Sequence, residues 1–237
     1  MRPSGQSLRD QGFVAPRLAA ASTGRGVRVA IVDSGVRSDH PGVRRAAKSF
    51  DVEWSEGSIV VREGAAPDRS GHGTACALLL DALAPDIELV SVRVTGDRPS
   101  TDSKRLARGI RVALEAGARI VCVPLGTESR DPELLSAASV AAERSILIAP
   151  DPRDVTVWPA GVNGAFSVGA WPGVDVARDA VGLVADPFGA PFAGRRRPSG
   201  PSFSAVRAAA AMARLIEELG DPRASVVGEF NKRLPVV

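Results

Sequence analysis

Three short segments of the chain carry side chains that could act together in nucleophilic catalysis. Asp33 lies in an Asp-Ser-Gly run, His72 in a Gly-His-Gly-Thr run and Ser202 in a Gly-Pro-Ser-Phe-Ser run. A serine hydroxyl is a weak nucleophile at neutral pH, so it needs a base within hydrogen-bond reach and a carboxylate that fixes the tautomer of that base. The chain has 2 histidines, His40 and His72, which leaves little freedom in the choice of base. The three runs together indicate a nucleophilic hydrolase.

Each run, taken alone, also has a purely structural interpretation. An Asp-Ser-Gly run is a common turn, a serine at a helix start is often an N-cap, and a lone histidine is usually structural. Glycines flank all three candidates, at Gly35, Gly71, Gly73 and Gly200, where a substrate or partner backbone would need close approach. The catalytic interpretation depends on the three runs occurring together.

The elements predicted around these residues would hold them firmly. The apolar run 27–32 predicts a buried strand that ends at Asp33. The run 75–83 consists of good helix formers without proline or glycine, which puts His72 near the start of a buried helix. Ser202 would open the last long helix, which is densely apolar and should run through the core.

Strand-like and helix-like segments alternate along the rest of the chain. Further strands are predicted at 87–94, 119–123, 145–149 and 165–170, helices at 102–115, 132–143 and 202–219, and loops at 51–70, 151–163 and 186–201. This alternation favours an α/β fold with a mostly parallel central sheet covered by helices on both faces. In such sheets functional groups gather at the carboxyl ends of strands and at helix N-termini, where all three candidates map.

Composition excludes several classes of function. With 237 residues, 44% of them apolar, we expect one large domain with a real core. The net charge of +3 comes from 30 basic and 27 acidic residues, so we expect no nucleic-acid partner. No run is apolar enough for a signal peptide or a membrane span, so we expect a cytoplasmic protein without membrane contact. Cys76 and Cys122 lie in apolar stretches, which favours buried free thiols over a disulfide.

Together the three runs resemble the motifs of the subtilisin-like serine proteases. The Asp-Ser/Thr-Gly, His-Gly-Thr and Gly-Thr-Ser-x-Ala/Ser motifs of that family fall on residues 33–35, 72–74 and 200–204, in the family's order. The resemblance runs from about residue 24 to residue 219. It implies a subtilisin-like three-layer α/β fold, with an N-terminal extension (1–23), a peptidase domain (24–220) and a C-terminal tail (221–237).

The resemblance also implies a role for each candidate. Asp33 orients the base, His72 acts as general base and then general acid, and Ser202 attacks a peptide carbonyl to form an acyl-enzyme. His40 follows the Asp motif by too few residues to be the family histidine and is interpreted as a loop residue. The implied function is a serine endopeptidase, with a peptide or precursor protein as its partner.

The oxyanion hole departs from the family, which uses an asparagine after an Ala-Ala-Gly segment. Asp151 occupies that position here, in an Ile-Ala-Pro-Asp run. An ionised carboxylate would repel an oxyanion, whereas a protonated one could donate a hydrogen bond; losing the donor costs a subtilisin about 10² to 10³ in kcat. The remaining donor would be the backbone N–H of Ser202, with Asn163 as a possible substitute. We expect a slow protease, or one favoured by mild acid.

The implied substrate-binding residues are Pro124, Leu125, Gly126 and Thr127, together with Ala149 and Pro150. An extended substrate would pair with the backbone around Leu125 to Thr127. Because proline removes a donor and fixes φ, Pro124 and Pro150 predict unusual, narrow specificity. The basic cluster at 195–197 is interpreted as a solvated loop or, because it lies just before Ser202, as a contact for an acidic residue of the substrate.

Further expectations follow from the resemblance by analogy. The segment 72–84 lacks the loop that carries calcium in secreted subtilisins, so we expect no metal and no cofactor. About 25 residues precede the resemblance, too few for the usual inhibitory pro-domain, which favours an intracellular enzyme that removes a leader from a precursor peptide. The alternatives are a catalytically impaired pseudo-protease that serves as a peptide-binding or scaffold module, and an esterase or peptide ligase with the same triad. Oligomeric state is not predicted.

Overall fold

The computed structural model describes residues 18–19, 21–43, 46–96, 100–173, 176–178, 183–189, 198–220 and 223–236. Its elements, in chain order, are β1 (Arg28–Asp33), β2 (Lys48–Ser55), β3 (Ser58–Glu63), α2 (His72–Leu83), β4 (Glu88–Arg93), α3 (Ser103–Glu115), β5 (Ile120–Cys122), α4 (Pro132–Arg144), β6 (Ile146–Pro150), β7 (Phe166–Ala170), β8 (Val176–Arg178), β9 (Leu183–Ala185), α5 (Pro201–Leu219) and α6 (Arg223–Arg233).

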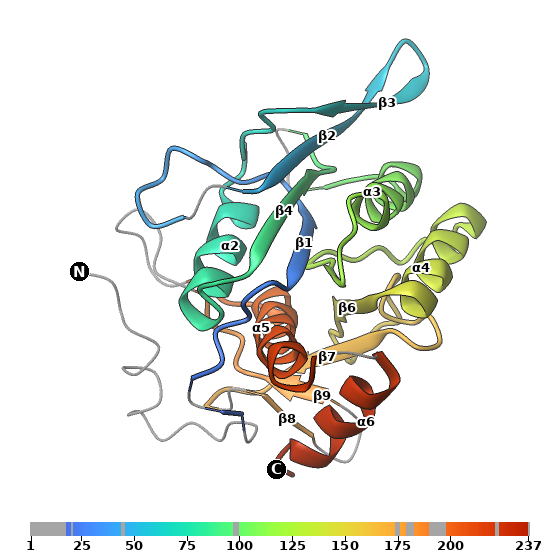
Figure 1. Ribbon diagram of the computed structural model, residues 1–237. Helices are drawn as coiled ribbons and strands as arrows, with labels where there is room; N and C mark the ends of the chain where they lie inside the picture. The colour runs from blue at the N-terminus through green and yellow to red at the C-terminus, as the bar shows by residue number, and fades with distance from the viewer. Residues whose placement is uncertain are drawn as a thin grey trace.

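A nine-stranded sheet forms the middle layer, in the order β3-β2-β4-β1-β5-β6-β7-β9-β8 (Figure 1). All neighbouring pairs from β2 to β9 are parallel, and the two edge pairs, β2 with β3 and β8 with β9, are antiparallel. Strands β1 and β6 are nearly continuous apolar runs because both of their faces are covered. The predicted mostly parallel sheet is confirmed.

Helices cover both faces of this sheet. Helices α2 and α5 pack on one face, with α6 beside α5, and α3 and α4 pack on the other (Figure 1). Neighbouring residues of β1 point to opposite sides, so that Ile31 belongs to the core under α2 and α5, and Val32 to the core under α3 and α4. Residues 208–213 of α5 are at most 4% exposed, so this helix runs through the core as predicted. The fold is the expected three-layer α/β arrangement.

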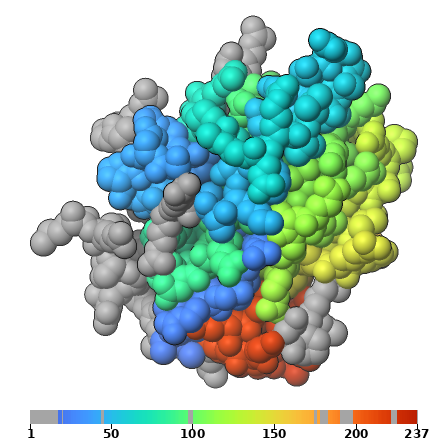
Figure 2. Space-filling model, turned by 45° about the horizontal axis from the view of Figure 1, so that its top comes forward, coloured from blue at the N-terminus to red at the C-terminus, as the bar shows by residue number. Residues whose placement is uncertain are grey.

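The predicted loop 51–70 is wrong over most of its length. Strands β2 and β3 form a hairpin that turns at Glu56 and Gly57, whose φ angles are 49° and 77°. Phe50, Val52 and Trp54 alternate with polar residues along β2, and Trp54 lies opposite Ile59 in β3. This alternation is the usual sequence signal of a strand, and the loop prediction instead followed the charged residues of the segment. The hairpin projects from the body of the molecule as the cyan lobe of Figure 2.

Helix α6 lies within the segment that was predicted to be a tail. Val226 and Phe230 on this helix are fully buried and belong to the same core as α5, and the Phe230 ring meets the Phe166 ring edge-on at 6.2 Å. The sequence signal for α6 is weak because the helix contains Gly228 and two adjacent valines. Val226 and Phe230 are therefore part of the core on this face of the sheet.

Some predictions fall outside the described residues. These include the basic cluster at 195–197 and nearly all of the N-terminal extension, 1–23. The predicted loop 151–163 is irregular, as expected, apart from a single bridge at Trp158. Within the described ranges, none of the helices has the length and apolar character that crossing a bilayer requires.

Phe230→Ala tests whether α6 is part of the core. Removing this buried ring should lower the free energy of unfolding by about 3–5 kcal/mol, measured by denaturant titration. Leu219→Ala, at a side chain that is 36% exposed at the end of α5, is the control and should change it by less than about 1 kcal/mol. Equal, small effects of the two variants would contradict this assignment.

Candidate active site

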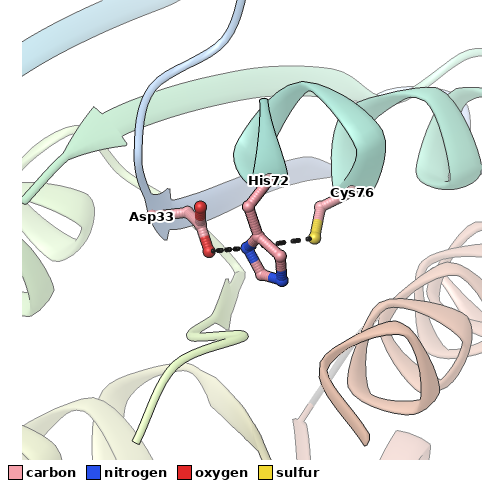
Figure 3. A group of neighbouring side chains, drawn as sticks. All are labelled: Asp33, His72 and Cys76. Atoms are coloured by element: carbon pink, nitrogen blue, oxygen red, sulfur yellow. Dashed lines mark hydrogen bonds and ion pairs between the residues drawn. The ribbon is translucent and has the colours of Figure 1, made fainter. Parts of the chain in front are cut away.

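Asp33 is the last residue of β1 and lies at the carboxyl edge of the sheet. It is 1% exposed. Its Oδ1 accepts a hydrogen bond from the N–H of Ser34 at 2.6 Å, and its Oδ2 lies 2.8 Å from Nδ1 of His72 (Figure 3). A buried carboxylate needs such partners because burial without them is costly. The side chain is therefore fixed in position by its own backbone neighbour and by the histidine.

His72 is the first residue of α2, and its imidazole points to Asp33. The carboxylate accepts the Nδ1 proton, so the neutral ring carries its lone pair on Nε2, which faces away from Asp33 in Figure 3. The histidine side chain is 29% exposed, so Nε2 is accessible from outside the core. This is the orientation and tautomer that a general base requires.

The site raises the affinity of His72 for a proton. Burial of the ring lowers the pKa of His72, but the neighbouring Cys76 and Asp33 and the hydrogen bond to Asp33 outweigh it, so the pKa lies above its ordinary value of 6.5. Burial also raises the pKa of the Cys76 thiol, which is therefore uncharged at neutral pH. We attribute the net effect to Asp33. The basic form of His72 then grows as the pH rises above neutrality.

Close backbone packing fixes the distance between β1 and α2. A Cβ at Gly73 would lie 2.2 Å from the carbonyl oxygen of Gly35 and 3.1 Å from Oδ1 of Asp33. A Cβ at Gly35 would lie 2.4 Å from the carbonyl oxygen of Ala66, and this glycine also has a positive φ of 93°. Both glycines are therefore required for the approach of the two segments.

Ser202 lies in the first turn of α5. Its neighbour Phe203 packs against the ring of His72, with the ring centroids 5.6 Å apart. Pro201 is the first residue of this helix, which suits its missing N–H. Within the described ranges, neither the Ser202 hydroxyl nor Nε2 of His72 has a hydrogen-bond partner. The structure brings Asp33 and His72 together and puts Ser202 on the adjoining helix, without a hydrogen bond between serine and histidine.

Asp151, which the resemblance predicts to replace the oxyanion-hole asparagine, follows β6 at the same edge of the sheet. Its N–H donates to the carbonyl of Val168 at 2.9 Å, and its Oδ1 accepts the N–H of Arg153 at 2.8 Å. Among the described residues, the N–H of Ser202 makes no backbone hydrogen bond, as is usual in a first helical turn.

Asn163 does not fit the substitute role that was predicted for it. It precedes β7, which runs parallel to β6, whereas Asp151 follows β6. Asn163 therefore lies at the amino edge of the sheet, and the oxyanion would form at the carboxyl edge. A five-residue strand separates the two edges by about 16 Å.

The predicted substrate-binding segment is partly free to pair with a peptide. Among the described residues, the backbones of Leu125 and Gly126 make no hydrogen bond, and Pro124 is buried. Thr127 differs, because its N–H and C=O both pair with Trp158 at 3.0 and 2.8 Å. The predicted backbone pairing with an extended substrate is therefore restricted to Leu125 and Gly126.

A cavity of about 220 Å³ adjoins this segment. It is lined by Asp151, Arg153, Asp154, Val155, Thr156, Val157, Ala160, Gly161 and Ser167. A Cβ at Gly126 would lie 3.2 Å from Val157, so the unpaired backbone runs along one wall of the cavity. Ala149 and Pro150 are buried in β6 and supply the strand that ends at Asp151. A larger cavity of about 420 Å³ lies at the opposite, amino edge, beside Arg119 and Ser145, away from His72.

Cys76 lies one helical turn after His72, with its Sγ 4.0 Å from Nδ1 (Figure 3). Asp33, His72 and Cys76 offer ligand atoms within 4.8 Å of one another, the one such group found in the described part of the chain. A metal there would need Nδ1, which is already engaged with Asp33, so metal binding and the base function exclude each other. Cys76 and Cys122 are both buried free thiols, as predicted.

Comparison with known proteins supports the interpretation of these motifs. Residues 24–173 match the model of the subtilase family. The chain belongs to the subtilase family. The matched region includes Asp33 and His72 and ends before Ser202, so the assignment of Ser202 depends on its motif and on its position at the start of α5.

Several curated subtilases are similar to this chain. An intracellular serine protease of Paenibacillus polymyxa is 28% identical over 177 residues, which are 66% of this chain and 53% of that protein. Subtilisin Savinase of Lederbergia lenta is 31% identical over 156 residues, 62% of this chain and 51% of that protein. Thermitase of Thermoactinomyces vulgaris is 29% identical over 133 residues, 52% and 46% of the two chains. The chain thus spans about half the length of these relatives.

The sequence interpretation missed one group at the site. Asp68 and Ser34 hydrogen-bond to each other and to the first turn of α2. The signal was the position of Asp68, four residues before His72 at the start of a buried helix, where a carboxylate can bind unpaired N–H groups.

Asp33→Asn tests the electrostatic origin of the raised pKa of His72. The substitution removes the negative charge and leaves the burial of the ring, so the pKa of His72 should fall below 6.5 in a ¹⁵N NMR titration. His40→Gln assigns the signals, because the chain has 2 histidines. Asp39→Asn removes an exposed carboxylate that pairs with Arg37 and should leave the pKa of His72 unchanged. A pKa that stays high in Asp33→Asn would refute the role of Asp33.

Proposed function

We propose that this chain is a serine endopeptidase whose triad is Asp33, His72 and Ser202. One observation carries the proposal: Asp33 binds Nδ1 of His72, while Nε2 has no partner among the described residues and the ring packs against Phe203 in the first turn of α5. Membership of the subtilase family supports it, as do the names of relatives, among them a serine protease and a subtilisin.

The proposed reaction assigns one step to each group. The Oγ of Ser202 attacks a peptide carbonyl while its proton passes to Nε2 of His72, and Asp33 stabilises the imidazolium. The imidazolium then gives this proton to the leaving amine, which breaks the peptide bond and leaves an acyl group on Ser202. Water attacks the acyl-enzyme with His72 again as base, which releases the acid and restores the hydroxyl.

Stabilisation of the oxyanion is the weak part of this site. The N–H of Ser202 is one available donor at the positive end of α5. The carboxylate of Asp151 accepts a backbone N–H and offers no proton of its own when ionised. Because the pKa of His72 is raised, the neutral imidazole that acts as base becomes more abundant at higher pH. A hydrogen bond donated by a protonated Asp151 would require lower pH, so the two requirements conflict. We therefore propose a slow enzyme that is favoured by alkaline pH, in place of the mild-acid preference predicted from the sequence.

The substrate proposed is a peptide in extended conformation. Leu125 and Gly126 would pair with its backbone, and the cavity beside Val157 would take one of its side chains. Pro124 follows β5 and Pro150 ends β6; both are buried, and each fixes φ of the backbone there. These features support narrow specificity, with a leader or precursor peptide as substrate inside the cell, where a named relative also acts as an intracellular protease.

A peptide-binding module without activity is the second candidate, and Asp151 is the observation that favours it. An esterase or ligase would use the same triad and differ in what attacks the acyl-enzyme. A fluorophosphonate probe separates enzyme from binding module. It should label the wild-type chain at a rate that rises with pH as His72 loses its proton, and labelling should vanish in Ser202→Ala. Absence of labelling between pH 5 and 9 in the wild type would refute the proposed function.

Asp151→Asn tests the oxyanion position. An amide at this place could donate to the oxyanion, so kcat for a peptide or activated ester should rise by about 10²-fold, a magnitude known from removing the donor in a subtilisin. Asp39→Asn, at an exposed carboxylate that pairs with Arg37, is the control and should leave kcat near wild type. A decrease of kcat in Asp151→Asn would show that the carboxylate itself takes part in the reaction.

A further inference from the structure

The carboxylate of Asp68 hydrogen-bonds to both segments that carry Asp33 and His72. Asp68 lies in the loop before α2 and is 9% exposed. Its Oδ1 accepts hydrogen bonds from Oγ of Ser34 at 2.7 Å, from the N–H of Gly71 at 2.8 Å and from the N–H of Ser70 at 3.0 Å. Its Oδ2 accepts from the N–H and the hydroxyl of Thr74 at 2.8 and 2.6 Å. The carboxylate thus fills its acceptor capacity.

Ser34 completes the connection to the end of β1. It directly follows Asp33, and its N–H donates to the Asp33 carboxylate. Its hydroxyl donates to Asp68 and accepts the N–H of Gly73 at 2.9 Å. Gly71 and Gly73 are the two neighbours of the histidine, so the backbone on both sides of the base is held by the pair of Asp68 and Ser34.

The start of α2 depends on this carboxylate. The N-cap residue is Gly71, which has no side chain to cap the helix. The first N–H groups of a helix lack partners within it, and a negative charge beside them is favoured. Thr74 is fully buried, so water could not reach its N–H and replace the carboxylate of Asp68 as acceptor if that carboxylate were removed.

We infer that Asp68 is a positioning residue of the proposed peptidase, which through Ser34 and the first turn of α2 holds the imidazole of His72 in register with Asp33. The inference depends on the proposed function for its catalytic meaning. Asp68 makes no hydrogen bond to the imidazole of His72 or to Ser202 in the described structure, so it acts through other residues. An asparagine cannot replace it, because its NH₂ group would face the donors of either Thr74 or Ser34.

Glu217 provides a matched control. It lies near the C-terminal end of α5, far along the helix from Ser202, and its Oε2 accepts the N–H groups of residues 23, 24 and 25 at 2.6, 2.7 and 3.2 Å. Like Asp68, it is a carboxylate that ties a loop to a helix by several backbone hydrogen bonds. Glu217→Gln therefore reproduces a loss of stability without a change at the base.

The test compares Asp68→Asn, Asp68→Glu, Ser34→Ala and Glu217→Gln in the full chain. The measurements are kcat and KM for an activated ester, the melting temperature, and the ¹⁵N shifts of the two ring nitrogens of His72, assigned with His40→Gln. Asp68→Glu keeps the charge and displaces the carboxylate, and Ser34→Ala breaks the connection without changing charge. Positioning predicts that the first three variants lower kcat by about 10- to 100-fold with KM unchanged. It also predicts that the two nitrogen shifts move toward each other as the Nδ1–H tautomer loses its preference.

The outcomes separate the inference from the proposed function. Positioning is supported if Glu217→Gln lowers the melting temperature about as much as Asp68→Asn does but leaves kcat and the ¹⁵N shifts of His72 at their wild-type values. Wild-type kcat and shifts in Asp68→Asn would overturn the inference while the enzyme remains active. Full activity in Asp68→Glu would also overturn it, because charge alone would then suffice. If the wild type proves inactive, the proposed function fails, and the ¹⁵N shifts still decide whether Asp68 orients His72.

Discussion

The site depends on the hydrogen bond between Asp33 and His72, which joins the end of a central strand to the start of a buried helix. The 2.8 Å contact requires β1 and α2 to approach until a single Cβ at Gly73 would collide with the backbone after β1. Burial of Asp33 strengthens the contact, because a hydrogen bond is electrostatically stronger in the low-dielectric interior than in water. The same contact fixes the tautomer of His72 and raises its pKa, and so sets both where and at what pH a base can act.

The rest of the fold supplies this contact. Parallel pairing of β1 with β4 and β5 puts its carboxyl end at an edge of the sheet where helices begin, and α2 and α5 pack together on one face. Phe203 then brings the start of α5 against the imidazole. Asp68 and Ser34 hold the turn between the strand and the helix from the other side. The geometry of this site therefore depends on the packing of three elements and one loop.

Features with strong local signals could be predicted from the sequence. The apolar runs before Asp33 and after His72 correspond to β1 and α2, and the candidate residues lie where a parallel sheet gathers functional groups. The hairpin at Trp54 was missed because its charged residues were interpreted as a loop, although alternating polar and apolar residues are typical of a strand. Helix α6 was missed because its helix propensity is poor, while burial of Phe230 in the tertiary structure stabilises it. Pairing of Thr127 with Trp158 depends on residues far apart in the chain, which no local pattern reveals.

The central claim is that Ser202 becomes acylated with His72 as the base. Intact and peptide-level mass spectrometry of the chain mixed with p-nitrophenyl acetate follows this step directly. The account predicts one acetyl group on Ser202, formed at a rate that rises as His72 loses its proton and that collapses in His72→Ala. Acetylation at other residues only, or a rate on Ser202 that is the same in His72→Ala, would contradict it.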